Sequence, residues 1–157
     1  MSELPPRLEV GSKAPDFSIP NQDGVLTTLQ DLAGKKAILY FYPAAGSPGC
    51  TKEAADFQDH LGEFKALGYE ILGISPDGVD RIKTFQEAHE LEFALLSDQD
   101  MTAHRAFGAY GEKNLYGRIF RGALRSTIVI DQNGVVSHAL YNVKATGHTN
   151  MLLKKLG

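Results

Sequence analysis

The sequence predicts an α/β protein whose central sheet is at least partly parallel. Two short, nearly continuous apolar runs are typical of strands that are buried on both faces. Segments with apolar residues at spacings of three and four follow these runs and predict helices. Asp-Gly and Asn-Gly pairs near the two ends of the chain are flanked by strand-like segments and indicate hairpins. Because helices lie between strands, at least part of the sheet is expected to be parallel.

The first 34 residues predict a β-hairpin followed by a short helix. Residues 16–19 and 25–27 read as strands and flank an Asp-Gly turn. Thr28 is a good N-cap for a short helix that runs through Leu32 and ends near Gly34.

The middle of the chain predicts two buried strands and two helices. Residues 36–42 form a nearly continuous apolar run and are expected to be a central strand. Residues 50–67 predict one long helix, which Gly68 would end, because their apolar residues recur every three or four positions. Residues 69–74 predict the second buried strand, and residues 76–91 predict the second helix.

The last third contains one segment without a clear regular pattern. Residues 108–123 are rich in Gly and Tyr and are expected to form a loop, whose unusual length suggests a functional role. The other predicted elements are a strand at 93–96, a helix at 100–107, a hairpin of strands at 126–130 and 135–141, and a helix of about ten residues after Gly147.

Composition limits the classes of protein that fit this chain. Its 157 residues are 43% hydrophobic and 22% charged, which is enough to build the core of one domain spanning residues 1–157. A net charge of −3, with both signs interspersed, argues against nucleic-acid binding through a broad basic face. No apolar run approaches the roughly 18 residues that span a membrane, and residues 1–10 lack the apolar core of a secretion signal. We therefore expect a cytoplasmic protein with no membrane or nucleic-acid partner.

Cysteine and histidine usage gives no sign of a metal or another cofactor. Cys50 is the only cysteine, so neither an intramolecular disulfide nor a cysteine-rich metal site can form. The histidines lie far apart in the sequence and lack the spacing of metal ligands; they are His60, His89, His104, His138 and His148.

The loop before Cys50 has the features of a reactive site. Residues 43–49 are rich in Gly and Pro and join the predicted central strand to the helix that Cys50 opens. Ligands of open α/β sheets usually bind at such a junction. The first amides of a helix, together with its dipole, favour an anion there. A free thiol is only about 3% ionised at pH 7, so this setting would increase its reactive thiolate form.

Three other interpretations of Cys50 are weaker. A buried cysteine can be a small hydrophobic residue, but that role does not require a loop fixed by prolines and glycines. A C-x-x-C reductase is excluded because Ser47 occupies the position of the first thiol. A cysteine phosphatase needs a glycine-rich anion cradle after the cysteine, whereas Glu53 and Asp56 follow here. We interpret Glu53 as a first-turn residue that favours the helix dipole.

Pro43, Ser47 and Cys50 fit the pattern P-x-x-x-(T/S)-x-x-C. On this pattern the chain resembles the peroxiredoxin family, in its bacterioferritin comigratory protein or Q-type branch. The likeness extends from about residue 11 to the end. Further matching segments are Ala14-Pro15-Asp16-Phe17, Gly73-Ile74-Ser75, Leu95-Leu96-Ser97-Asp98, Arg125-Ser126-Thr127 and Asn142-Val143-Lys144-Ala145. The resemblance implies a thioredoxin-like fold, with a mixed central sheet flanked by helices, and reduction of hydrogen peroxide and organic hydroperoxides.

The resemblance also implies a role for each site residue. Cys50 matches the peroxidatic nucleophile, and Arg125 matches the guanidinium that holds the thiolate and the substrate oxygens. Pro43 matches the residue that shields the pocket from water. Ser47 matches the hydroxyl that bonds the thiolate and the peroxide, although threonine is commoner there. Ser47 before Pro48 is also a good helix N-cap, and we expect it to fill both roles.

The lack of a second thiol predicts a one-cysteine mechanism. Many Q-type relatives carry another cysteine five residues after the first, where this chain has Ala55. The sulfenic acid formed on Cys50 would then be reduced by thioredoxin, a glutaredoxin-like protein or a small thiol. A redox sensor that forms a mixed disulfide with a client protein is the alternative, and a structural thioredoxin-fold module is a third possibility. We expect a monomer or a weak dimer.

Overall fold

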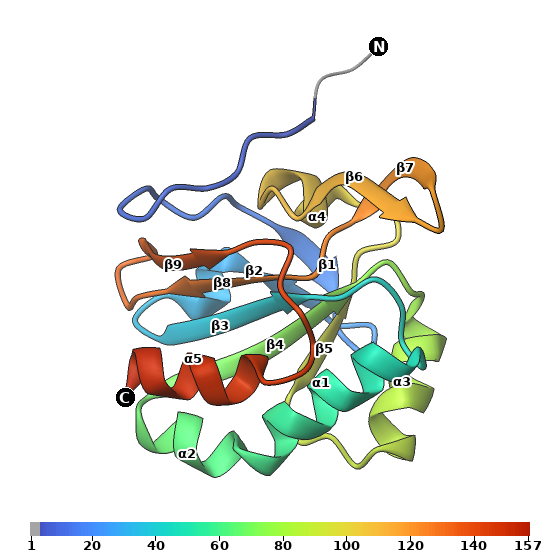
Figure 1. The fold of residues 1–157 in the computed structure, drawn as a ribbon. Coiled ribbons are helices and arrows are strands. Elements are labelled where there is room, and N and C mark those ends of the chain that lie inside the picture. The colour runs from blue at the N-terminus through green and yellow to red at the C-terminus, as the bar shows by residue number, and fades with distance from the viewer. Residues whose placement is uncertain (1–3) are drawn as a thin grey trace.

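A five-stranded mixed sheet forms the centre of the protein, with strand order β5-β4-β3-β8-β9 (Figure 1). The parallel part comprises β3 (Lys36–Phe41), β4 (Tyr69–Ser75) and β5 (Ala94–Ser97). β8 (Ser126–Ile130) runs antiparallel to β3, and β9 (Val136–Leu140) runs antiparallel to β8. The computed structural model describes residues 4–157 apart from the side chain of Leu115, so the first three residues of the predicted domain lie outside it. The sheet is mixed, as the sequence predicted.

Both faces of the sheet are buried, because side chains of β3 alternate between two hydrophobic clusters. Ile38 and Tyr40 face the cluster formed with α1, α2, α3 and α5, whereas Leu39 and Phe41 face the one formed with α4 and the N-terminal segment. Figure 1 shows α1, α2 and α5 together on one side of the sheet, and α4 on the other. The helix bounds are α1 (Pro48–Asp59), α2 (Leu61–Ala66), α3 (Val79–Ala88), α4 (Thr102–Ala106) and α5 (His148–Leu156). This is the thioredoxin-like arrangement expected from the sequence.

The predicted N-terminal hairpin and short helix are both confirmed. β1 (Ser18–Pro20) pairs antiparallel with β2 (Leu26–Thr28). A short 3₁₀ helix, η1 (Leu29–Leu32), follows directly. The Thr28 hydroxyl accepts from the amide of Asp31, whose carboxylate accepts from the amide of Thr28. This reciprocal capping box explains why the helix starts where the sequence predicted.

The predicted loop at 108–123 is wrong, since this segment is a second β-hairpin. β6 (Tyr110–Leu115) pairs antiparallel with β7 (Arg118–Ala123) along six residue pairs. Tyr116 and Gly117 form the turn, and both have positive φ, at 54° and 79°. Two consecutive residues of this conformation make a tight turn that suits hairpin strands. The hairpin packs beside α4, where the Arg105 guanidinium lies 4.5 Å from the centre of the Tyr110 ring.

The predicted helix at 50–67 is also wrong in extent. The helical backbone is interrupted at His60, where φ is −105° and ψ is 11°, and α2 starts at the next residue. Phe57 and Phe64, on either side of the break, are both fully buried. The apolar spacing continues across the break, so the sequence pattern could not reveal it. The other helices and strands differ from the predictions only at their ends.

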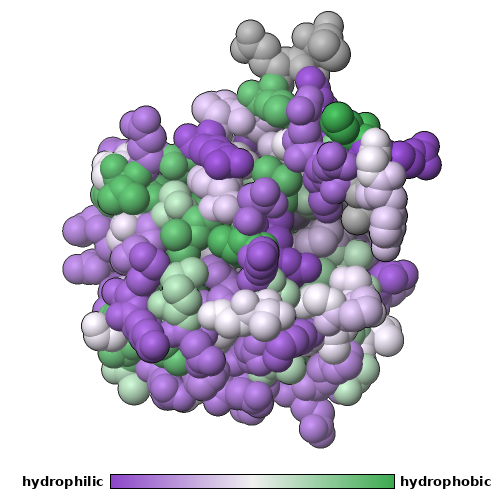
Figure 2. All heavy atoms as spheres, viewed as in Figure 1, coloured by the Kyte–Doolittle hydropathy of each residue, from purple (hydrophilic) through white to green (hydrophobic). Residues whose placement is uncertain are grey.

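On the face of the molecule shown in Figure 2, apolar residues form separate patches among polar residues. Among residues 4–157, none of the helices combines the length and the apolar character that crossing a membrane requires. The described residues likewise contain no group of three or more His, Cys, Asp or Glu side chains that could hold a metal ion.

Candidate active site

Cys50 lies in the first turn of α1, directly beyond the end of the central strand. β3 ends at Phe41, a short loop follows, and α1 starts at Pro48, two residues before Cys50. The helix therefore starts two residues before Cys50, the residue that was predicted to open it. The thiol is free and its residue is 1% exposed. The thiol therefore lies close to the positive end of the helix dipole.

Arg125 brings a positive charge directly to the sulfur of Cys50. Its Nη2 donates to Cys50 Sγ at 3.3 Å, and its Nη1 donates to Glu53 Oε1 at 2.6 Å. The strand register explains this meeting, because Ser126 of β8 pairs with Phe41 at the end of β3. Arg125, one residue before Ser126, is thereby placed beside the loop that follows β3. The sequence named Cys50 and Arg125 as site residues, and the fold brings them into contact.

Gly49 leaves the space through which the guanidinium reaches the sulfur. A Cβ atom at this position would lie 3.3 Å from Arg125 Nη2 and 3.9 Å from the Cβ atom of Ala145. A larger residue at position 49 would therefore press on the Arg125 side chain.

Glu53 belongs to the site together with Cys50 and Arg125, which the sequence did not indicate. Its side chain is fully buried and it is the sixth residue of α1, so the interpretation as a first-turn residue is wrong. Burial raises the pKa of Glu53 to about 7, against the opposing effect of the Arg125 guanidinium. The available signal was its spacing of three residues from Cys50, which puts the two side chains on one helix face.

Ser47 occupies the N-cap position of α1, but its hydroxyl does not cap the helix. The hydroxyl donates to the carbonyl oxygen of Ala44 at 3.0 Å, within the loop. The predicted side-chain cap is therefore wrong, although the backbone of Ser47 is extended as an N-cap requires. Pro43, at the start of the loop, is half-buried.

Aromatic side chains pack in the hydrophobic cluster that contains Cys50. Tyr40 stacks on Tyr42 and on Phe57 of α1, with ring centres 5.4 and 4.5 Å apart. All three belong to the cluster that contains Cys50. Phe41 faces the opposite cluster, so it is a core residue on the far side of the sheet from Cys50.

The β6–β7 hairpin approaches the site through Lys113. Burial lowers the pKa of Lys113, the Arg125 guanidinium acts in the same direction, and Cys50 opposes both. The hairpin that the sequence misread as a loop thus carries a cation within electrostatic reach of the thiol and the guanidinium.

The free cysteine lies at the start of the helix that follows a central parallel strand, and it contacts a guanidinium. This arrangement defines a thioredoxin-fold protein with thiol redox chemistry. Residues 10–139 match the AhpC/TSA family. A putative peroxiredoxin of Mycobacterium tuberculosis (strain H37Rv) is 50% identical over 150 residues, which cover 96% of both chains. Peroxiredoxin Bcp of Escherichia coli (strain K12) is 38% identical over 149 residues, which cover 95% of this chain and 96% of that one.

Solved structures agree with these relatives. The bacterioferritin comigratory protein of Xanthomonas campestris superposes with a TM-score of 0.87 at 36% identity, covering 94% of this chain and 97% of that one. The chain belongs to the AhpC/TSA family, in its peroxiredoxin Bcp or Q-type branch. It is a peroxidase enzyme.

Proposed function

We propose that this enzyme reduces hydrogen peroxide and organic hydroperoxides through Cys50 alone, and that an external thiol restores it. The observation that carries this proposal is the 3.3 Å contact between Arg125 Nη2 and Cys50 Sγ at the start of α1. A guanidinium and helix amides around one sulfur place positive charge beside the nucleophile of this reaction. The Xanthomonas campestris relative is described as reducing alkyl peroxides, which supports organic hydroperoxides as substrates.

In the oxidation step the Cys50 thiolate attacks one peroxide oxygen. An S–O bond forms and the O–O bond breaks, so Cys50 becomes a sulfenic acid while the peroxide is reduced to water or an alcohol. Negative charge moves from sulfur to the leaving oxygen, which then takes up a proton. Fixed donors stabilise that charge without reorganising, and Arg125 offers several N–H groups in a rigid fork. We assign the second donor role to the Ser47 hydroxyl, which has to turn away from the Ala44 carbonyl oxygen to donate to the peroxide, and the exclusion of water to Pro43.

Recovery of the thiol needs a second molecule, because the chain holds no other cysteine. A reductant thiol attacks the sulfenic sulfur, water leaves, and a mixed disulfide forms. A second thiol on the reductant, or from another small thiol, then releases Cys50 as the reduced form. Cys50 is 1% exposed, so the loop or the start of α1 must open before a protein thiol can reach it. Thioredoxin, a glutaredoxin-like protein and a small thiol are the candidate reductants.

A peroxide-consumption assay with a panel of these reductants tests the proposal. The protein should turn over many times with at least one reductant, whereas Cys50→Ser should consume no peroxide because it lacks the nucleophile. Peroxide consumption that survives in Cys50→Ser would refute the assignment. Stoichiometric oxidation that no reductant reverses would favour the redox sensor, in which oxidised Cys50 forms a mixed disulfide with a client protein.

A further inference from the structure

We propose that Asp77 is a positioning residue for peroxide reduction, because it holds the loop that delivers Cys50 to Arg125. The proposal rests on the function proposed above. Asp77 lies between β4 and α3, and its hydrogen bonds and ion pair within the described chain go to Ala45, Ser75, Arg81 and Ser97 rather than to Cys50 or Arg125. It acts through Ala45, in the loop between β3 and α1.

Both backbone polar groups of Ala45 are held by one ion pair. The Ala45 amide donates to Asp77 Oδ2 at 2.6 Å, and Arg81 Nη2 donates to the Ala45 carbonyl oxygen at 3.3 Å. Arg81 Nε lies 3.1 Å from Asp77 Oδ1, which completes the arrangement. The Asp77 side chain is 14% exposed and Ala45 is 2% exposed. Burial strengthens the charge-assisted bond between Asp77 and the Ala45 amide, whereas the Arg81 side chain is 66% exposed and its two bonds contribute less.

This clamp of Asp77 and Arg81 links residues 43–46 to other elements, whereas Tyr42 before them is held separately, its amide donating to the carbonyl oxygen of Ile74 in β4 at 3.0 Å. Within the described chain, the two bonds to Ala45 are the only hydrogen bonds from residues 43–46 to groups outside the loop. The remaining bonds are internal, from the amide and hydroxyl of Ser47 to the carbonyl oxygen of Ala44. The Ser47 carbonyl then accepts from the amide of Thr51 in α1. Releasing Ala45 would therefore free the segment that fixes the start of α1.

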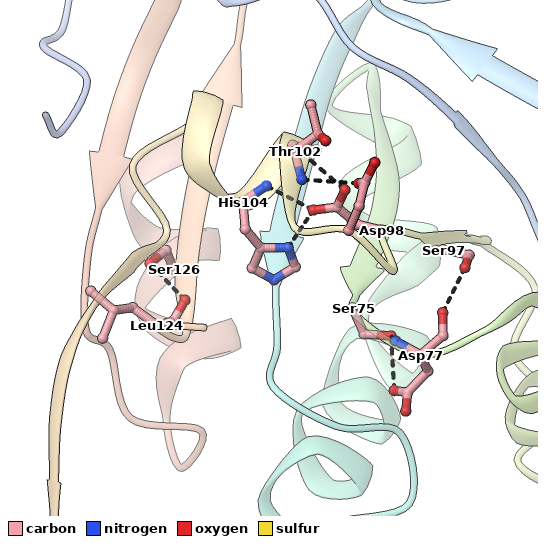
Figure 3. Close-up of polar contacts among 10 residues, drawn as sticks. Ser75, Asp77, Ser97, Asp98, Thr102, His104, Leu124 and Ser126 are labelled. Atoms are coloured by element: carbon pink, nitrogen blue, oxygen red, sulfur yellow. Dashed lines mark hydrogen bonds and ion pairs between the residues drawn. The ribbon is translucent and has the colours of Figure 1, made fainter. Parts of the chain in front are cut away.

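The end of the sheet orients the Asp77 carboxylate and backbone. The Ser75 hydroxyl donates to Asp77 Oδ2 at 2.9 Å, and the Ser97 hydroxyl donates to the Asp77 carbonyl oxygen at 2.6 Å (Figure 3). Ser75 and Ser97 are paired at the carboxyl ends of the parallel strands β4 and β5. Both serines are buried. Because these partners fix the Asp77 side chain relative to the sheet, Asp77 can hold the loop in a fixed position relative to the sheet.

Cys50 and Arg125 come from different elements, so their contact depends on how the loop is held. Cys50 follows the loop after β3, whereas Arg125 precedes β8. A misplacement of about 1 Å between reacting groups costs about a hundredfold in rate. The clamp of Asp77 and Arg81 is thus placed to set the rate of peroxide attack without touching the reacting atoms.

Stopped-flow oxidation of Cys50 by hydrogen peroxide, compared with its alkylation by iodoacetamide, tests this role. Asp77→Ala should lower the rate constant with peroxide by about 10- to 100-fold, because that reaction needs alignment with Arg125. Alkylation, measured at about pH 10 where an ordinary thiol is ionised without a neighbouring cation, should stay the same or accelerate, since it needs no alignment and a loosened loop exposes the sulfur. Asp80→Ala is the matched control: it removes the same charge from the first turn of α3, and it should behave as wild type.

Graded variants keep the test decisive if Asp77→Ala does not fold. Asp77→Asn retains an oxygen for the Ala45 amide but places an amide group against Arg81, and Arg81→Ala removes only the bond to the Ala45 carbonyl and the ion pair. Both should lower the peroxide rate less than Asp77→Ala does. Unchanged peroxide rates in the folded variants, or equal losses in peroxide and iodoacetamide rates, would overturn the proposal. A wild-type protein that does not react with peroxide would instead refute the proposed function.

Discussion

Arg125 Nη2 donates to Cys50 Sγ at 3.3 Å, although 75 positions of sequence separate the two residues. The same guanidinium donates to Glu53 Oε1 at 2.6 Å. One cation therefore joins the thiol to a buried carboxyl group, and the charge state of this trio affects both reactivity and stability.

Loss of Arg125 should slow the oxidation of Cys50. Arg125→Ala is expected to lower the rate constant with peroxide by about 10²-fold, the effect of removing one fixed donor from a developing charge. Arg125→Lys should lie between alanine and wild type, because lysine keeps the charge but not the planar fork. Rapid-mixing measurements would check this, with Arg118→Ala on the exposed part of β7 as the control. Equal rates in wild type and Arg125→Ala would remove Arg125 from the mechanism.

Glu53 should make the folded state less stable as the pH rises. Burial raises its pKa from 4.5 to about 7, so the folded protein holds this proton more tightly than the unfolded chain. The stabilising contribution is complete below pH 4.5 and is lost as the pH rises toward 7. Relative to Glu53→Gln, wild type should lose about 3 kcal/mol of unfolding free energy across that interval. Urea denaturation at several pH values measures the difference, and parallel curves for the two proteins would contradict it.

His148 should have the opposite pH dependence. Its pKa is lowered from 6.5 to about 4 by burial, and the Arg125 guanidinium acts in the same direction. Its contribution is therefore complete above pH 6.5 and is lost as the pH falls toward 4. His148→Gln can keep a bond to the Thr127 hydroxyl, which lies 2.7 Å from His148 Nε2, and it removes the titration. Acid denaturation should consequently require lower pH in His148→Gln than in wild type; an unchanged acid midpoint would count against the assignment.

Excess peroxide should oxidise Cys50 beyond the sulfenic acid. The chain has no second thiol to trap that intermediate as an internal disulfide. Intact-protein mass spectrometry should therefore find two or three added oxygen atoms, with peptide mapping placing them on Cys50. An excess of a reducing thiol added beforehand should suppress this product. A protein that keeps its reduced mass in excess peroxide would not contain an accessible peroxidatic thiol.

The fold was predictable where local patterns and buried runs agree. Residues 36–42 gave the central strand because a continuous apolar run suits a strand buried on both faces. The β6–β7 hairpin was missed because Tyr116 and Gly117 form its turn without the usual Asn-Gly or Asp-Gly pair. The break at His60 was missed because the apolar spacing of α1 continues into α2.

The site was predictable only in part, since its contacts join distant segments. Cys50 could be proposed from its loop and helix, but Arg125 was named only through a family resemblance. Its contact with Cys50 depends on the pairing of Ser126 with Phe41, which no local pattern encodes. Asp77 had no signal of its own, because its proposed role comes from one bond to Ala45 across 32 positions of sequence.

In the proposed mechanism, peroxide converts Cys50 to a sulfenic acid that an external thiol can reduce. One equivalent of hydrogen peroxide, added with a sulfenic-acid-specific trapping reagent and followed by intact mass, tests this most directly. Wild type should carry one adduct per chain on Cys50, whereas Cys50→Ser should carry none, and no adduct should form when a reducing thiol is added before the trap. Unmodified wild-type protein with the peroxide still present would contradict it.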